Sequence, residues 1–242
     1  MRIGILSDVH GNYEALEVVL QALKDECIDC TYCLGDLVGY GPDPNPCVEK
    51  VMDFVDKTVV GNHDVAAIGH IPTSEFNIYA SMAIDWTRGV LDSESIRSLN
   101  ELPFLLIEED VTLVHATPEA PDEWDYILSI VDAQRSFGAL KTQLCFVGHT
   151  HVPEIFIREE DGRISNYNAG ELEFEVSKKY IINVGSVGQP RDGDPRASYG
   201  ILDTDERRFR LNRVSYPIDT VQEKMVKVNL PEYLIERLSY GK

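Results

Sequence analysis

Five short polar motifs, each directly after an apolar run, constrain this chain more than any other feature. In chain order they are Asp8-Val-His10, Gly35-Asp36, Gly61-Asn62-His63-Asp64, Val114-His115 and Gly148-His149-Thr-His151. The apolar runs before them are typical of buried strands and cover residues 3–6, 32–34, 57–60, 111–114 and 144–147. Ligand sites of α/β sheets form where strands end. Five of the six histidines belong to these motifs, so we predict that they meet in one site.

Helical periodicity alternates with the first of these strands. Apolar side chains recur at helical spacing over residues 16–23, 48–55 and 79–86, which predicts three helices. This alternation is typical of a parallel sheet with helices packed on it. From residue 104 onward apolar runs follow one another with few helices between them, over residues 104–108, 111–115, 143–147, 153–157, 164–168, 179–184, 199–203 and 207–214. These runs predict a second, partly antiparallel sheet.

We therefore predict an α/β fold in which two mixed sheets pack face to face and helices lie outside them. No linker rich in Gly, Pro or Ser interrupts the sequence, so residues 1–242 are expected to form a single domain. Its last part, residues 217–242, is predicted to be a helical tail. With 242 residues and 43% hydrophobic composition, the chain can bury the core that such a domain needs.

An acidic composition narrows the possible partners. Lys and Arg together number 22 against 41 Asp and Glu, which gives a net charge of −19. Such a chain repels nucleic-acid backbones, so duplex DNA or RNA is not expected as a partner. A site for an anionic phosphate would have to create its own positive field, as bound divalent cations do.

The sequence predicts a cytoplasmic protein without a membrane segment. It has no apolar run of about 18 residues, and its first residues lack a signal-peptide pattern. Five cysteines, an odd number, fit a reducing compartment better than a disulfide framework. Cys27, Cys30 and Cys33 are spaced like metal ligands, but a spacing of three does not place thiols on one face of a strand. We interpret these cysteines as structural.

The ordered set of motifs resembles the calcineurin-like metallophosphoesterase superfamily, whose pattern is D-x-H, G-D, G-N-H-D/E, a lone H and G-H-x-H. Residues 35–45 and 183–191 look like the compact prokaryotic phosphodiesterase branch of that superfamily. Its Ser/Thr protein phosphatases carry an Asp-Arg pair shortly after the G-D motif. Residues 37–42 contain no Arg, which argues against that activity. The resemblance implies the superfamily's four-layer sandwich, with two sheets between layers of helices.

The resemblance also implies two divalent metal ions and assigns their ligands. Asp36 bridges both ions, and the remaining ligands are Asp8, His10 and His151 for one ion and Asn62, His115 and His149 for the other. Mn²⁺, Fe²⁺ and Zn²⁺ all accept this mixture of carboxylate, imidazole and amide groups. In such sites a metal-bridging hydroxide attacks phosphorus in line with the leaving group.

Local spacing and one further pair of residues complete the predicted site. The i, i+2 spacing of Asp8 and His10, repeated in His149 and His151, places each pair on one side of an extended segment. In the superfamily that this chain resembles, the residue equivalent to His63 acts on the leaving oxygen. Asp64 follows it and is expected to fix the tautomer of its imidazole.

Substrate contacts are predicted from two loops and one turn. Arg191 and Arg196 could bind phosphate oxygens, or they could be solvated arginines of a surface loop. Trp124 and Tyr126, in the loop after His115, could stack on a nucleobase or could anchor that loop on the core. The same two interpretations apply to Tyr40.

The function predicted from these residues is hydrolysis of a small phosphorylated substrate by a binuclear-metal phosphoesterase. Phosphodiesters or nucleotide-like substrates, including dinucleoside polyphosphates, are the leading candidates. The alternatives are a phosphomonoesterase of the same chemistry and a non-catalytic metal-bound scaffold for partner proteins. A scaffold can dispense with His63, and its presence favours the enzyme. The sequence is also compatible with a homo-oligomer.

Overall fold

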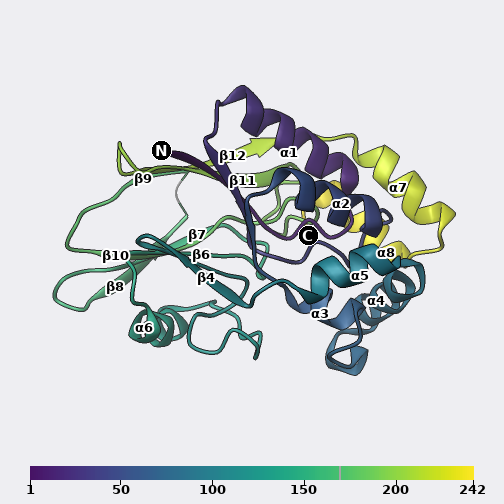
Figure 1. Cartoon of the computed structure of the whole chain (residues 1–242), viewed down its shortest axis with the longest axis horizontal. Coiled ribbons are helices and arrows are strands. Elements are labelled where there is room, and N and C mark those ends of the chain that lie inside the picture. Colours follow the sequence, from purple (N-terminus) through teal and green to yellow (C-terminus); the bar gives the residue numbers. More distant parts are fainter. Residues whose placement is uncertain (169) are drawn as a thin grey trace.

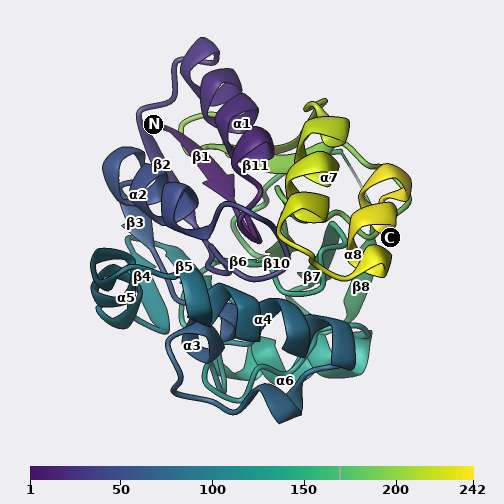
Figure 2. The ribbon, with the colours of Figure 1, turned by 90° about the vertical axis from the view of Figure 1, so that its right-hand side faces the viewer.

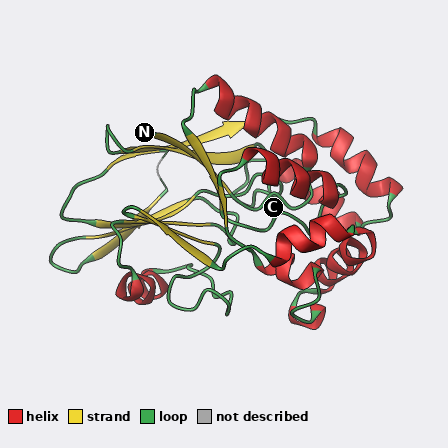
Figure 3. Cartoon of the chain, in the orientation of Figure 1, coloured by secondary structure: helices red, strands yellow, loops and turns green. Residues whose placement is uncertain are grey.

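Two sheets of six strands form the centre of the computed structural model, which describes residues 1–168 and 170–242 (Figures 1 and 3). The strands of the first sheet are, in order, β3 (Lys57–Thr58), β2 (Cys30–Cys33), β1 (Arg2–Leu6), β11 (Ala197–Asp203), β12 (Arg208–Val214) and β9 (Glu171–Glu173). The second sheet contains β4 (Leu105–Glu108), β5 (Val111–Val114), β6 (Leu144–Val147), β10 (Lys179–Asn183), β7 (Glu154–Arg158) and β8 (Ile164–Tyr167). Both sheets mix parallel and antiparallel pairs, as predicted.

Helices cover the outer faces of this sandwich. They are α1 (Tyr13–Asp25), α2 (Pro44–Phe54), α3 (Asn62–Ala67), α4 (Ile78–Val90), α5 (Ser93–Asn100), α6 (Ile130–Ala139), α7 (Ile218–Lys227) and α8 (Glu232–Arg237), with the short 3₁₀ turns η1 (Thr73–Glu75) and η2 (Leu238–Tyr240). Figure 1 shows α1 and α7 beyond the first sheet and α6 beyond the second. Figure 2 shows α4, α7 and α8 gathered at one end of the molecule, where Tyr233 of α8 stacks on Tyr79 of α4 with ring centroids 4.7 Å apart.

Side-chain alternation in the strands divides the core into three layers. Along β1, Ile3 and Ile5 point into the space between the sheets, whereas Leu6 packs with the helices of the first sheet. Phe146 of β6 and Phe209 of β12 meet between the sheets with ring centroids 5.7 Å apart. A third cluster lies between α6 and the outer face of the second sheet. Both faces of the central strands, such as β1, β5, β6 and β10, are thus buried, which explains why these strands read as continuous apolar runs.

The order of strands differs from the simplest interpretation of the sequence. β11, β12 and β9 come late in the chain but join the first sheet, where β11 pairs antiparallel with β1. β1 is already paired with β2 on one edge, and β11 supplies partners for the backbone groups on its other edge. Helix α6 interrupts a region expected to contain few helices. It connects β5 to its parallel neighbour β6, and a parallel pair requires such a crossover.

The predicted helices over residues 16–23, 48–55 and 79–86 are confirmed as α1, α2 and α4. The chain ends in α7, α8 and η2. Within the described residues, no helix is long and apolar enough to cross a membrane. The organisation of residues 1–242 as a single domain stays a prediction.

We expect Phe146→Ala to lower the free energy of unfolding by about 3–5 kcal/mol, because it leaves a cavity in the fully buried layer between the sheets. Urea denaturation followed by circular dichroism measures this loss. The matched change Ile107→Ala removes a side chain that is 50% exposed and should cost less than about 1 kcal/mol. Equal losses in the two variants would contradict the assignment of Phe146 to the core.

Candidate metal centre

The five polar motifs meet at one edge of the sandwich, where strands of both sheets end. Ligand atoms of Asp8, His10, Asp36 and His151 all lie within 4.8 Å of one another, and those of Asp36, His115 and His149 form a second group of the same kind. The Asn62 Oδ1 atom lies 3.2 Å from His115 Nε2 and joins the second group. All seven residues are buried, with Asn62 the most exposed at 8%.

Backbone carbonyls fix the orientation of the four imidazoles. The bonds run from His10 Nδ1 to the Val38 oxygen (3.0 Å), from His115 Nδ1 to Leu34 (2.7 Å), from His151 Nδ1 to Gln189 (2.6 Å) and from His149 Nε2 to Trp124 (2.9 Å). A carbonyl can only accept, so the proton of each neutral ring lies on the nitrogen that faces it. In the neutral form of each ring, the form that binds a metal, the other nitrogen therefore turns a lone pair toward the cluster, as is usual for metal-ligating histidines.

This arrangement of lone pairs fits divalent cations. The Nε2 atoms of His10 and His151 face each other at 3.0 Å, although both lone pairs point into the gap. The Asp36 Oδ2 atom is buried and has no hydrogen-bond partner among the described residues, and His115 Nε2 lies 3.3 Å from it. Buried groups of this kind repel one another unless positive charge lies between them. Carboxylate, imidazole and amide donors together suit Mn²⁺, Fe²⁺ and Zn²⁺.

Ionisation of the cluster follows from burial and from mutual interaction. Burial alone would raise the pKa of Asp36, but the neighbouring histidines, His115 foremost, hold it well below its usual range. Burial opposes the charge on His115, yet Asp36 and Asp8 raise its pKa to about 9. Burial lowers the pKa of His149 to about 4 and that of His151 to about 3, with Arg191 contributing to the second shift. At neutral pH these two rings are neutral and their lone pairs are available.

The backbone at the site is left-handed rather than extended, which corrects the expectation drawn from the i, i+2 spacing. Five of the metal-ligand candidates have positive φ: Asp8 (55°), His10 (52°), Asp36 (54°), His149 (67°) and His151 (61°). Such conformations cost on the order of 1–3 kcal/mol each and concentrate at functional sites. Hydrogen bonds between loops hold them, including His10 N–H to the Asp36 oxygen at 2.9 Å.

The loops after β2 and β3 approach each other closely because the third motif has a glycine, Gly61, at its first position. A Cβ atom there would lie 2.1 Å from the Asp36 Oδ1 atom, a separation that no side chain tolerates. Any larger residue would displace the carboxylate that both donor groups share. Gly61 is therefore needed for the two loops to pack together at the site.

His63 lies beside the cluster at the start of α3 and lines a cavity next to it. Its ring packs 4.4 Å from that of Tyr40 and 5.1 Å from that of Phe76, between centroids. Its backbone N–H donates to Asp36 Oδ1 at 2.8 Å. The Nδ1 atom of the ring has no hydrogen-bond partner in the part of the chain that the structure describes.

Asp64 does not contact the His63 ring nitrogens, which corrects the expectation that it fixes their tautomer. Its carboxylate instead accepts three backbone N–H groups, from Leu37 (2.8 Å), Val38 (3.1 Å) and Gly61 (3.1 Å). These donors belong to the loops after β2 and β3. Asp64 therefore joins the two loops that carry Asp36 and Asn62.

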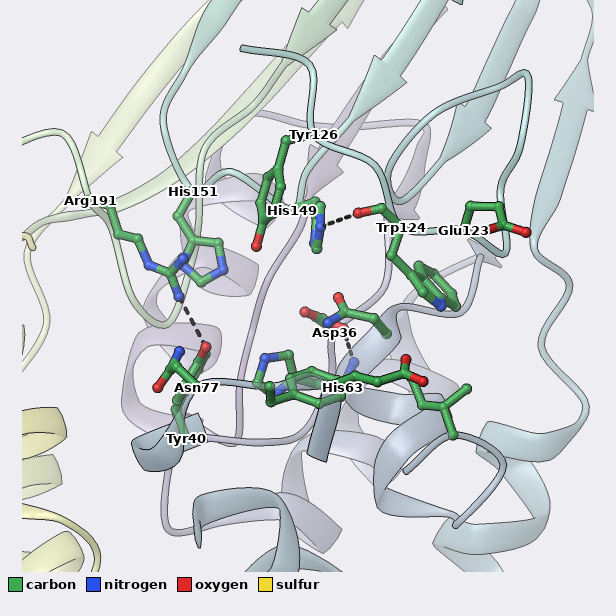
Figure 4. Close-up of a pocket in the computed structure, with 14 residues that line it drawn as sticks. Asp36, Tyr40, His63, Asn77, Glu123, Trp124, Tyr126, His149, His151 and Arg191 are labelled. Atoms are coloured by element: carbon green, nitrogen blue, oxygen red, sulfur yellow. Dashed lines mark hydrogen bonds between the residues drawn. The ribbon is translucent and has the colours of Figure 1, made fainter. Parts of the chain in front are cut away.

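The cavity beside the cluster has a volume of about 270 Å³ (Figure 4). Tyr40, Trp124, Tyr126 and Arg191 all line it, so the structure brings these predicted substrate contacts together. Arg191 donates to the Tyr40 hydroxyl at 3.2 Å and to Gln189 Oε1 at 2.9 Å. Arg196 does not line this cavity, since its guanidinium pairs with Asp194 at 2.6 Å in an exposed turn.

The Trp124 loop contributes to the site through both backbone and side chains. Tyr126 stacks on His149 with ring centroids 4.1 Å apart and planes inclined by 14°. The carbonyl of Trp124 accepts from the same imidazole. Both contacts orient His149, so this loop is anchored on the predicted metal ligands while it lines the cavity.

Five residues that line the rest of the cavity were not predicted from the sequence. Ile71, Glu75, Phe76 and Asn77, from the segment between α3 and α4, line it together with Glu123. Their position directly after the third motif was the available signal, because a segment that leaves a site must border it.

A model of the calcineurin-like phosphoesterase superfamily domain matches residues 1–207. The chain belongs to this superfamily. It is 43% identical to an uncharacterised protein of Methanocaldococcus jannaschii, over 99% of this chain and 98% of that protein. A solved metallophosphoesterase from Sphaerobacter thermophilus is 44% identical and superposes with a TM-score of 0.86, covering 100% of this chain and 99% of that one.

Two relatives with named activities are more distant. Phosphodiesterase YfcE of Escherichia coli is 25% identical over 85% of this chain and 89% of its own length. A symmetrical bis(5'-nucleosyl)-tetraphosphatase of Sodalis glossinidius is 27% identical, but over only 50% of this chain and 44% of that enzyme. The family and these relatives make the chain a phosphoesterase, and therefore a hydrolase.

We expect Asp64→Asn to lower the free energy of unfolding by about 3 kcal/mol, because an amide cannot accept all three backbone N–H bonds as a carboxylate does. Chemical denaturation measures the change. Asp161→Asn, at an exposed carboxylate paired with Arg163, is the matched control and should leave the free energy of unfolding nearly unchanged. A loss no larger than that of the control would show that Asp64 does not hold the two loops together.

Proposed function

We propose that this chain is a phosphodiesterase that depends on two divalent cations. The observation that carries the proposal is the set of buried imidazole lone pairs directed at two ionised carboxylates. One cation would be held by Asp8, His10, Asp36 and His151. The other would be held by Asp36, Asn62, His115 and His149, so that Asp36 serves both. The donor set accepts Mn²⁺, Fe²⁺ or Zn²⁺.

The protein residues prepare a phosphoryl group for attack by water. When bound, two such cations attract phosphoryl oxygens and make water more acidic. Arg191 is placed to bind an oxygen that is not displaced, because its guanidinium lines the cavity and is held by Tyr40 and Gln189. Tyr40 and the Trp124 loop line the same cavity and would contact the alcohol parts of the substrate.

We propose that His63 donates a hydrogen bond or a proton to the leaving oxygen. Its ring lines the cavity and is held in place by Tyr40 and Phe76 rather than by a carboxylate. The Nδ1 atom is buried and faces Gly39, where a Cβ atom would lie 2.4 Å from it, so we assign the contact with the leaving oxygen to Nε2.

Two alternatives differ from this proposal in chemistry or in class. A phosphomonoesterase would use the same cations, and the relation to phosphodiesterase YfcE over most of both chains favours the diester. A metal-bound scaffold for partner proteins would not need an open cavity beside His63, which this chain has. Cytoplasmic location and a homo-oligomeric state stay predictions.

We expect Asp36→Asn to lose both cations together, because one carboxylate belongs to both donor groups. Elemental analysis after purification from Mn²⁺-supplemented buffer counts the ions per chain. Asp53→Asn, at an exposed position of α2, should keep the wild-type count. If Asp36→Asn retained two ions, the proposed bridging role would be wrong.

We expect His63→Gln to lower kcat by about 10²–10⁴-fold for diesters with poor leaving groups, as for loss of a general acid. For bis(p-nitrophenyl) phosphate the loss should be much smaller, because p-nitrophenolate leaves without help. Metal content should not change. His70→Gln, at an exposed histidine bonded to Asn100, is the matched control and should leave kcat unchanged. Equal losses for good and poor leaving groups would exclude the acid role.

A further inference from the structure

The cavity beside the metal centre has two electrically different sides. Arg191 lies on one side with His151, and Glu123 lies on the opposite side next to Trp124 (Figure 4). Glu75, from η1, adds a second carboxylate to the cavity lining. Within the described residues neither carboxylate forms a salt bridge, and both side chains are exposed to solvent at the rim. No cationic side chain of a described residue therefore neutralises either carboxylate as a substrate enters.

A count of charges indicates what the cavity can accept. Two divalent cations and Arg191 would bring five positive charges, and Asp8, Asp36, Glu75 and Glu123 would remove four of them. Without Glu75 and Glu123 three positive charges would remain, and with them one, so the rim lowers the charge available to a substrate by two whatever else the site holds. A phosphomonoester carries about 1.5–2 negative charges at neutral pH. A dinucleoside polyphosphate carries one on every phosphate.

We infer that Glu75 and Glu123 select phosphodiesters with a single negative charge and disfavour monoesters and polyphosphates. The inference rests on the proposed phosphodiesterase function and names its substrate class. The phosphate of such a diester would lie between the cations and Arg191, and its uncharged arm on the side of Trp124 and Glu123. An additional phosphate would meet Glu123 there, Glu75 is a second carboxylate of the same lining, and Arg191 is the one Lys or Arg side chain among the described residues that line the cavity.

Distance and screening set the size of this selection. Two unit charges on the order of 8 Å apart in water change a binding constant about two- to threefold. Two carboxylates acting on one additional negative charge therefore give a factor of about five. The factor grows with every further phosphate. Because both carboxylates are exposed, the effect must weaken as salt shortens the Debye length to about 3 Å at 1 M.

The test compares two double variants of the full-length, Mn²⁺-loaded protein. Glu75→Gln/Glu123→Gln removes the rim charges, and Glu49→Gln/Glu94→Gln removes two exposed charges from α2 and α5, away from the cavity. Both change the net charge equally, so only a local effect separates them. The substrates are bis(p-nitrophenyl) phosphate, p-nitrophenyl phosphate and diadenosine tetraphosphate.

In the rim variant, KM should fall about fivefold for the diester, which carries one negative charge, and by more for the monoester and the tetraphosphate, which carry more, so the KM ratio of monoester to diester should fall. The control variant should leave the KM ratios between the substrates unchanged. In 0.5 M NaCl the difference in KM between the rim variant and the wild type should become smaller. The inference would be overturned if the KM ratios between the substrates were unchanged in the rim variant, or if KM changed equally in the control variant.

Calorimetric binding of inorganic phosphate separates this inference from the proposed function. Phosphate should bind at least about fivefold more tightly to the rim variant than to wild type, and equally to wild type and control. This measurement needs no turnover. If no diester were hydrolysed, the proposed function would fail while the binding comparison still decided the role of the carboxylates. Equal phosphate affinity in all three proteins would overturn that role.

Discussion

Buried lone pairs that face one another are the constraint on which the rest of this structure depends. Four imidazoles donate their outer N–H groups to backbone carbonyls and turn their other nitrogens toward Asp8 and Asp36. The carbonyls belong to different loops, so the orientation of each ring depends on the arrangement of all of them. Such a set is stable only with positive charge inside it. For the proposed metal centre, folding and cation binding are therefore coupled.

The backbone of the site is adapted to this constraint at a local cost. Away from the site and its cavity, the left-handed non-glycine residues Cys27, Glu109, Arg207 and Asn229 all lie at exposed positions. At the metal centre the same conformation is buried, and hydrogen bonds between loops must compensate for it. The cost is offset by the layers on either side of the strands, where large apolar side chains are fully buried. The buried core of the sandwich thus offsets the unfavourable backbone conformations at the site.

Much of the fold and the donor set could be predicted because both leave local marks in the sequence. Each ligand motif follows an apolar run, and strands buried on both faces produce such runs. The return of β11 and β12 to the first sheet leaves no such mark, since it depends on which edge of β1 is free. The left-handed turns also could not be predicted, because Asp and His adopt positive φ more often than most residues but still at only a minority of positions. The partners of Asp64 could not be predicted either, because they are backbone groups of loops distant in sequence.

The rim of the cavity is a product of tertiary structure alone. Glu75 and Glu123 are two among 41 acidic residues, and only the folded chain brings them to the same opening. Arg191 and Arg196 likewise cannot be told apart in the sequence, since both lie in the same polar loop. In the structure Arg196 pairs with Asp194 in a turn and does not line the cavity. A chain with a net charge of −19 repels phosphates at long range, so in the proposed mechanism attraction is local and comes from the cations. The carboxylates at the opening would limit how much negative charge those cations can hold. Selectivity would then depend on these two nearby charges and not on the overall acidity of the chain.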